Sequence, residues 1–146
     1  MGVKLWQSYR LRLRRRRWHI RAWRKRRELS CIYDNTAKIA TKDVIVFCTI
    51  RNEDIRLPYF LKYYRNIGVN HFIFIDNGST DDGPNFLKQQ PDVSVWQTEA
   101  SYKDSRFGVD WLNYLHRNYG DSHWCLVVGP DEFFVIPVMD NRPIQA

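Results

Sequence analysis

Three short clusters of polar side chains could carry chemistry in this 146-residue chain, and each follows an apolar run. The first contains Arg51 and Glu53, the second begins at Asp76 in the stretch DNGSTDD, and the third is the pair Asp131 and Glu132. A carboxylate pair beside an aqueous crevice can hold Mg²⁺ or Mn²⁺, which in turn bridges substrate phosphates. A single carboxylate at a strand end can accept hydrogen bonds from a ribose or from a base edge. These residue types therefore permit nucleotide binding with a divalent cation.

Each cluster also has a purely structural interpretation. Asp and Asn readily hydrogen-bond to nearby backbone amides, so Asp76 can equally serve a tight turn. Gly129 and Pro130 can open a turn whose two acidic residues simply lie at the surface. A calcium loop of the EF-hand type is excluded, because the twelfth position counted from Asp76 is Leu87 rather than a bidentate glutamate. Local chemistry alone leaves the nucleotide and the turn interpretations open.

The segments between the clusters have the periodicity of alternating strands and helices. Nearly continuous β-branched and aromatic runs predict four strands, at 43–50, 69–76, 92–98 and 123–128. Apolar residues at helical spacing predict three helices, at 54–67, 84–90 and 105–118. This order predicts an α/β fold with a Rossmann-like sheet of mostly parallel strands and flanking helices. Ligands of such sheets bind beyond the carboxyl ends of the strands, so the three clusters should face one crevice.

The segment 1–30 differs from the rest in charge. Residues 1–27 contain 12 Lys and Arg and no Asp or Glu, whereas the other 119 residues carry 11 basic and 16 acidic groups. Five apolar residues recur at helical spacing and form a stripe: Trp6, Tyr9, Leu13, Ile20 and Trp23. This pattern predicts a basic amphipathic helix, which could lie in an anionic headgroup layer or pack its stripe on the domain. Arginines and tryptophans also permit nucleic-acid binding, but we do not expect nucleic acid to be the partner.

Length and composition limit the remaining possibilities. The chain is long enough for one domain, predicted at 43–146, and 31–42 is predicted to be a connector. Three widely spaced cysteines without a C-x-x-C pair favour a reducing compartment. No apolar run reaches the roughly 18–20 residues that span a bilayer, and the charged start lacks the apolar core of a signal peptide. We therefore expect a cytoplasmic protein, with the inner face of the membrane as a candidate place of peripheral attachment.

Two stretches, TIRNEDIRLPYFLKYYRNIGVNHFIFIDNGSTDDG and HWCLVVGPDEFF, together resemble family 2 glycosyltransferases. The likeness is to the bacterial branch with an R-N-E start, a D-N-G/A-S-x-D turn and a D-A-D-E-F/L strand end. It covers about residues 43–137, and its three motifs occur in the family's order. The resemblance implies part of a GT-A fold, binding of a nucleotide-sugar donor, and a divalent cation, Mg²⁺ or Mn²⁺.

The resemblance also implies roles for particular residues. Arg51 and Glu53 would border the nucleotide, and Asp76 would contact its base or ribose. Arg106, which precedes the last predicted strand, is a weaker candidate for contact with the nucleotide or its phosphates. Asp131 matches the final aspartate of the family's D-x-D motif and would bind the metal on the diphosphate.

The chain departs from the family pattern in two ways. Gly129 stands where the family has the first aspartate of the D-x-D motif, so one carboxylate is missing. The chain reaches Ala146 soon afterwards, whereas family members continue through an acceptor-binding half that usually supplies the base. Asp110 and His116 lie on a predicted helix, and neither is assigned that role, so no catalytic residue is predicted.

We therefore expect the donor-binding half of a transferase, as a fragment, a truncated gene product or a degenerate relative. Such a chain would transfer a sugar if the other half is present. Alternatively, it would be a catalytically impaired relative that acts through its basic helix as a membrane-surface or interaction module.

Overall fold

Five strands form one mixed sheet in the order β1-β4-β3-β2-β5 in the computed structural model, which describes residues 2–135 and 144. The strands are β1 Ser30–Tyr33, β2 Val44–Ile50, β3 His71–Asp76, β4 Val93–Gln97 and β5 Trp124–Val127. The helices are α1 Gly2–Lys25, α2 Leu57–Asn66, α3 Gly83–Lys88 and α4 Val109–Tyr119, with short 3₁₀ turns at Arg26–Glu28 and Thr36–Lys38. The prediction of an α/β fold with a mostly parallel sheet, flanking helices and an N-terminal helix is confirmed.

Four of the strands are parallel. β2 pairs with β3 on one side and with β5 on the other, and β3 pairs with β4. The segment 31–42, expected to be a connector, instead contributes most of β1, which pairs antiparallel with β4 at the edge of the sheet. β1 is a short strand whose residues are exposed or half-buried, so it lacks the apolar run that identified the central strands.

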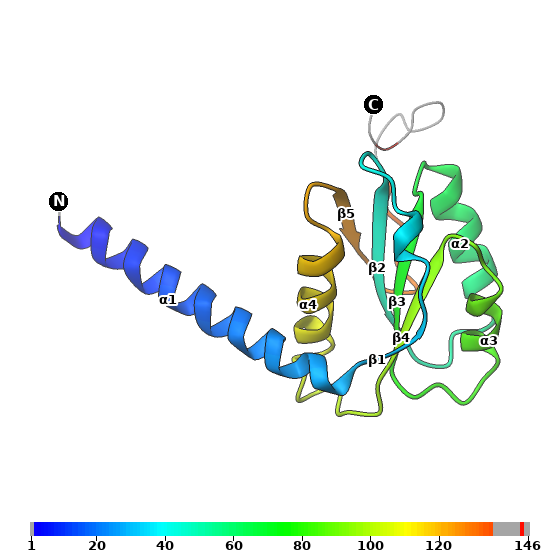
Figure 1. Cartoon of the computed structure of the whole chain (residues 1–146), viewed down its shortest axis with the longest axis horizontal. Coiled ribbons are helices and arrows are strands. Elements are labelled where there is room, and N and C mark those ends of the chain that lie inside the picture. Colours follow the sequence, from blue (N-terminus) through cyan, green and yellow to red (C-terminus); the bar gives the residue numbers. More distant parts are fainter. Residues whose placement is uncertain (1, 136–143, 145–146) are drawn as a thin grey trace.

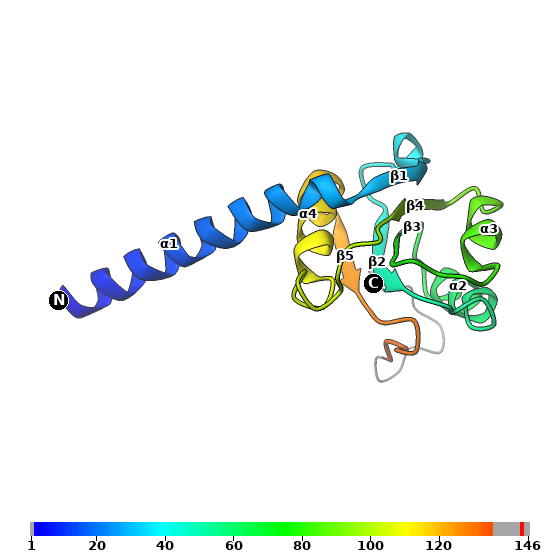
Figure 2. The same cartoon turned by 90° about the horizontal axis from the view of Figure 1, so that it is seen from below.

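Helices cover both faces of the sheet (Figures 1 and 2). Alternate side chains of each strand point to opposite faces, so β2 supplies both apolar layers. On one face, α2 and α3 pack on the sheet, with Phe60 and Leu87 fully buried among residues such as Phe74. On the other face, Trp111 and Leu115 of α4 pack against Ile45 and its neighbours. This burial on both faces explains why the central strands are almost continuously apolar.

Helix α1 leaves the domain and extends well beyond it (Figure 1). Only its last turns lie beside α4, where Ala22 is buried. Trp18, Ile20 and Trp23 are about half exposed. None of the helices within residues 2–135 is both long and apolar enough to cross a bilayer.

The buried imidazole of His71 predicts a pH dependence of stability. Its Nε2 atom lies 3.0 Å from the Ser94 hydroxyl, and burial lowers the pKa of His71 from its ordinary value, although nearby carboxylates oppose the shift. Below a pH of about 6.5, the unfolded chain takes up a proton at this position that the folded chain does not. The free energy of unfolding should therefore fall with falling pH, by up to about 1.4 kcal/mol per pH unit from this group.

Urea unfolding of the wild type and of His71→Gln, at neutral pH and below the ordinary pKa of histidine, checks this contribution. All other groups titrate alike in the two proteins, so the wild type should lose more stability than the variant. Equal losses in the two proteins would contradict the assignment.

Candidate functional site

The three polar clusters meet at the carboxyl edge of the sheet, which lies at the bottom of Figure 1 and faces the viewer in Figure 2. A pocket of about 300 Å³ opens there. It is lined by eight residues: Thr49, Ile50, Arg51, Glu53, Asn77, Tyr102, Pro130 and Asp131. These residues come from the last positions of β2 and from the segments that follow β2, β3, β4 and β5. The three clusters were expected to face one crevice. Each of them contributes at least one side chain to this pocket.

The loops after β2 and β3 are joined by hydrogen bonds. The backbone N–H of Asn52 donates to the Ser79 hydroxyl at 2.9 Å, and the Asn52 side-chain oxygen accepts from the Thr80 N–H at 2.7 Å. The Asp54 N–H donates to the Asp81 carboxylate at 2.9 Å. Asn52 adopts a positive φ of 55°, which asparagine tolerates better than most residues. The two motifs therefore form one polar platform beside the pocket.

Asp76 stabilises the turn after β3. Its side chain is fully buried, and its carboxylate accepts from the Ser79 N–H at 3.2 Å and from the Gln97 amide at 3.5 Å. Asp76 does not line the pocket in this conformation, whereas the next residue, Asn77, does. The Asn77 side-chain amide donates to the carbonyl of Ala100 at 3.0 Å, which holds the residue against the loop after β4. The turn interpretation thus describes Asp76 itself, and its neighbour Asn77 lines the pocket.

Arg51 and Glu53 give the pocket both signs of charge. The Arg51 guanidinium is exposed and forms no ion pair with any residue that the structure describes, so it is available to an anion. The Glu53 carboxylate accepts from Arg56 at 2.5 Å, and its side chain is only 17% exposed. A phosphate beside Arg51 would gain a charge-assisted contact, but it would also meet the negative charge of Glu53.

Carboxylates gather around the end of β2. Burial, together with the negative charges of Glu53, Glu132 and Asp131, raises the pKa of the Cys48 thiol. Asp131 lies on the turn after β5, where the Gly129 N–H donates to the Glu132 carboxylate at 2.6 Å. A side chain at position 129 would place its Cβ 3.0 Å from Asp131 Oδ1, which is tighter than ordinary contact. Because glycine has no Cβ, Gly129 leaves room for the Asp131 carboxylate at the pocket.

Two tyrosines of α2 hold the segment that carries Asp131. The Tyr64 hydroxyl donates to the Glu132 carbonyl at 2.9 Å and accepts from the Phe134 N–H at 3.2 Å. The Tyr63 hydroxyl donates to the Phe134 carbonyl at 2.8 Å. The Phe133 ring meets the Tyr63 ring edge-on, with 4.9 Å between the centroids. Packing and hydrogen bonds thus keep this segment against α2.

Arg106 lies outside the pocket in this structure. Its guanidinium pairs with Asp110, and its charge lies 5.3 Å from the centre of the Trp18 ring of α1. Arg106 and Phe107 have positive φ values of 55° and 58°, and Gly108 follows at 79°. This left-handed stretch explains why α4 begins at Val109, later than the helix start predicted at residue 105.

Thr49 and Tyr102 are pocket residues that the sequence reasoning missed. The Thr49 hydroxyl is buried without a hydrogen-bond partner among residues 2–135 and 144, so the pocket wall contains a polar group that a ligand could satisfy. Tyr102 is 44% exposed and offers an aromatic ring. A Cβ at Gly108 would come within 3.0 Å of both side chains, so only glycine fits there. The place of Thr49 as the penultimate residue of its strand was a usable signal, whereas nothing local marked Tyr102.

The carboxylates that line the pocket suit a hard cation that is held partly by the protein and partly by a bound ligand. Across the described part of the chain, no three His, Cys, Asp or Glu side chains come together as a metal cluster. Glu53 and Asp131 nevertheless line the same pocket. Mg²⁺ is commonly held by one or two carboxylates together with substrate phosphates and water, so these two side chains fit that mode and not a protein-only cage.

Comparison with known proteins adds no family assignment. A scan against protein-family models and a search of curated proteins both find no match to this chain. The resemblance to family 2 glycosyltransferases therefore rests on the three sequence motifs alone.

Removing the Tyr64 hydroxyl should loosen the segment that carries Asp131. Tyr64→Phe keeps the buried ring but deprives the Glu132 carbonyl and the Phe134 N–H of their partner, so it should cost about 1–2 kcal/mol of stability. Hydrogen exchange of the Phe134 amide should accelerate. The matched control is Tyr59→Phe, because Tyr59 is also on α2 and touches Phe133, but its hydroxyl bonds to no described residue. Unchanged exchange in Tyr64→Phe would show that packing alone holds the segment.

Proposed function

We propose that this chain is the donor-binding part of a glycosyltransferase-like protein of the GT-A type, and that its pocket binds the nucleoside diphosphate of a nucleotide sugar. The observation that carries the proposal is the meeting of three separated motifs at one pocket, which lies at the carboxyl edge of a mostly parallel sheet. Open α/β sheets bind ligands at this edge. The volume of about 300 Å³ is at the lower end of the range for small-molecule sites, which suits part of an open nucleotide cleft.

Each polar group of the pocket has a role in the proposed complex. Arg51 binds a phosphate, since its guanidinium is exposed and unpaired among the described residues. Tyr102 offers a ring on which a base can stack. Asn77 and Thr49 supply hydrogen-bonding groups at the pocket wall. Asp76 holds the turn that places Asn77.

The charges of the pocket predict that donor binding depends on a divalent cation. Asp131 would repel a diphosphate placed beside it, whereas the charge of Glu53 is already paired with Arg56. Mg²⁺ or Mn²⁺ held by Asp131, with Glu53 nearby, would remove that repulsion. In a transfer reaction the cation would supply Lewis-acid stabilisation of the departing nucleoside diphosphate.

The proposal for the described residues is limited to donor binding. Transfer to an acceptor hydroxyl needs a base near the pocket. Asp110 and His116 do not line it. The Asp110 carboxylate is bound by Arg21 and Arg106, and the His116 ring packs on Phe47 with 5.4 Å between the centroids. No described residue is therefore assigned as a catalytic base.

Calorimetric titration with UDP and GDP, each with and without Mn²⁺, tests the proposal. One of the two nucleotides should bind in the presence of the metal, and EDTA should abolish binding. Asp131→Asn should weaken metal-dependent binding by about tenfold or more, because the cation loses a charged ligand. Arg51→Ala should weaken binding by about 10–100-fold through the loss of a charge-assisted contact.

Asp121→Asn provides the matched control for the charge change. Asp121 is exposed and lines a hollow between α1 and α4, away from the pocket, so this variant should bind as the wild type does. Absence of metal-dependent binding by a folded wild-type protein would refute the proposed function.

A further inference from the structure

Helix α1 attaches to the domain through one side only. On that side, Ala22 is 4% exposed and lies against α4. The Arg21 guanidinium donates to Asp110 Oδ2 at 2.8 Å and to the Asp104 carbonyl at 2.9 Å. The Trp18 ring lies beside the guanidinium of Arg106. The docked side of α1 is therefore defined by Trp18, Arg21 and Ala22.

The apolar stripe of α1 is exposed along its length, although Ile20 and Trp23 also border an open hollow that α4 side chains line from the other side. An α-helix turns by about 100° per residue, so Ile20 and Leu13 lie roughly 200° and 180° around the axis from Ala22. Both are exposed, at 53% and 42%, and Tyr9 in the same stripe is 61% exposed. Trp23, on the flank of the stripe, is 53% exposed. The sequence left two interpretations of the stripe, contact with a lipid surface and packing on the domain. The exposure of these side chains does not fit packing on the domain.

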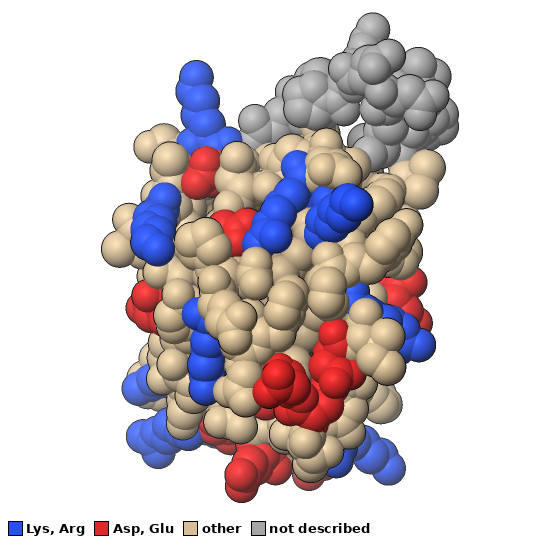
Figure 3. All heavy atoms as spheres, turned by 90° about the vertical axis from the view of Figure 1, so that its right-hand side faces the viewer, with Lys and Arg blue, Asp and Glu red and all other residues tan. Residues whose placement is uncertain are grey.

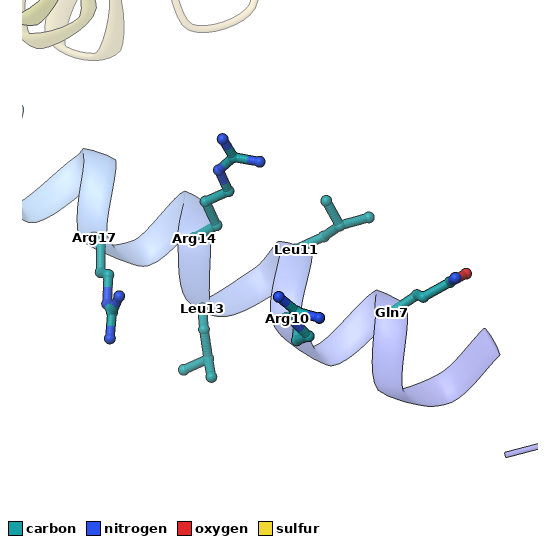
Figure 4. A pocket seen from close by; sticks show the side chains of 6 residues that line it. All are labelled: Gln7, Arg10, Leu11, Leu13, Arg14 and Arg17. Atoms are coloured by element: carbon teal, nitrogen blue, oxygen red, sulfur yellow. The ribbon is translucent and has the colours of Figure 1, made fainter. Parts of the chain in front are cut away.

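Of the hollows that α1 side chains line, two lie between α1 and α4, and one is an open groove beside the projecting part of the helix. This groove, of about 730 Å³, is lined entirely by α1 side chains. Figure 4 shows that Leu11 and Leu13 leave the helix on opposite sides. Apolar and cationic groups are thus mixed around this part of the helix, and Leu11 and Leu13 do not belong to one surface.

The charge of α1 selects an anionic partner. The helix carries ten Lys and Arg and no Asp or Glu. The domain face turned away from α1 shows both signs of charge interspersed (Figure 3). The projecting helix α1 is therefore cationic, whereas the rest of the chain has an excess of acidic residues. An anionic surface would be attracted to α1 rather than to the domain.

The composition of the stripe favours a lipid surface over other anionic partners. Tryptophan and tyrosine have an apolar body and a polar tip, so they suit the boundary between headgroups and acyl chains. Leu13 and Ile20 gain from leaving water at that boundary, whereas a nucleic-acid backbone offers them no apolar surface. Two copies of α1 packed by their stripes would bring twenty like charges together.

We propose that α1 lies on an anionic lipid surface, with the stripe of Tyr9, Leu13, Ile20 and Trp23 inserted and the surrounding arginines on the headgroups. The Asp110 ion pairs on the docked side hold the domain to this helix. Asp110 is fully buried, and its two oxygens are used separately, one by Arg21 of α1 and the other by Arg106 of the 101–108 loop. That loop also carries Tyr102 of the pocket. The candidate site is thereby held in a fixed position relative to the membrane.

Sedimentation of the full chain with vesicles tests lipid binding. The wild type should bind vesicles of phosphatidylcholine with phosphatidylglycerol and not phosphatidylcholine alone, and added salt should weaken binding. The double variant Leu13→Gln/Ile20→Gln should lose at least about tenfold in affinity, because the inserted apolar surface is gone. Equal binding to neutral and anionic vesicles would overturn the proposal.

Leu11→Gln is the matched control for the stripe. Leu11 is 63% exposed, lies on the same helix, and points to the other side from Leu13 (Figure 4). Its affinity for vesicles should stay within about twofold of the wild type. A loss as large as that of the double variant would show that binding does not use the stripe.

Two further measurements distinguish a lipid surface from the other candidate partners of α1, which are nucleic acid and a second copy of the chain. Displacement of the protein from vesicles by single-stranded RNA, with equal RNA binding by the wild type and the stripe variant, would overturn the proposal in favour of nucleic acid. A dimer in the absence of lipid, abolished by the stripe variant, would overturn it in favour of a second copy of the chain. A monomer whose lipid binding RNA does not displace supports the proposal.

Arg21→Gln tests the part of the proposal that concerns the domain. It removes only the α1 side of the Asp110 ion pairs, and Arg21 is half exposed, so the domain core stays intact. On vesicles this variant should keep its affinity within about twofold but show faster hydrogen exchange in residues 101–108 than the wild type. Unchanged exchange would show that the ion pairs do not hold the domain to the membrane-bound helix.

Discussion

The parallel pairing of β2 on both of its edges is the constraint on which the rest of the structure depends. β3 and β5 run in the same direction as β2, with Ile50 opposite Asp76 and Phe47 opposite Val127. The loops after these strands, which are distant in sequence, must therefore leave the sheet at one edge. Because β2 and β3 are buried on both faces, their side chains are mostly apolar, and polar side chains gather at and beyond their carboxyl ends. The pocket is a consequence of this arrangement.

The parts of the fold that sequence predicts well are those buried on both sides. The strands predicted at 43–50 and 69–76 match β2 and β3 within two residues, because a fully buried parallel strand leaves a continuous apolar run. β1 has no such run, since it is a short edge strand held mainly by backbone pairing with β4. The start of α4 was predicted four residues early because Phe107 continues the apolar spacing of the helix, and no sequence pattern indicates the left-handed backbone at this residue.

At the pocket, the sequence identifies which loops take part but not which of their side chains line it. Arg51, Glu53 and Asp131 line the pocket as expected. Asp76 and Asn77 are adjacent and chemically alike, and only the direction of the chain after β3 decides that the first is buried and the second lines the pocket. Tyr102 also lines the pocket, but it lies in the 101–108 loop, where no sequence motif indicates a role. Such choices depend on contacts between distant segments, for example that of Asn77 with Ala100.

The attachment of α1 illustrates how a buried charge can connect two surfaces. A carboxylate without a counter-charge would be strongly destabilised in the interior, and Asp110 has two counter-charges, Arg21 and Arg106. One arginine comes from the helix with the exposed apolar stripe and the other from the loop that borders the pocket. Loss of either partner leaves the same buried carboxylate undercompensated, so the position of α1 and the conformation of the loop are energetically linked. The small docked side of α1 is sufficient for this link, and it leaves the opposite side of the helix free for a partner.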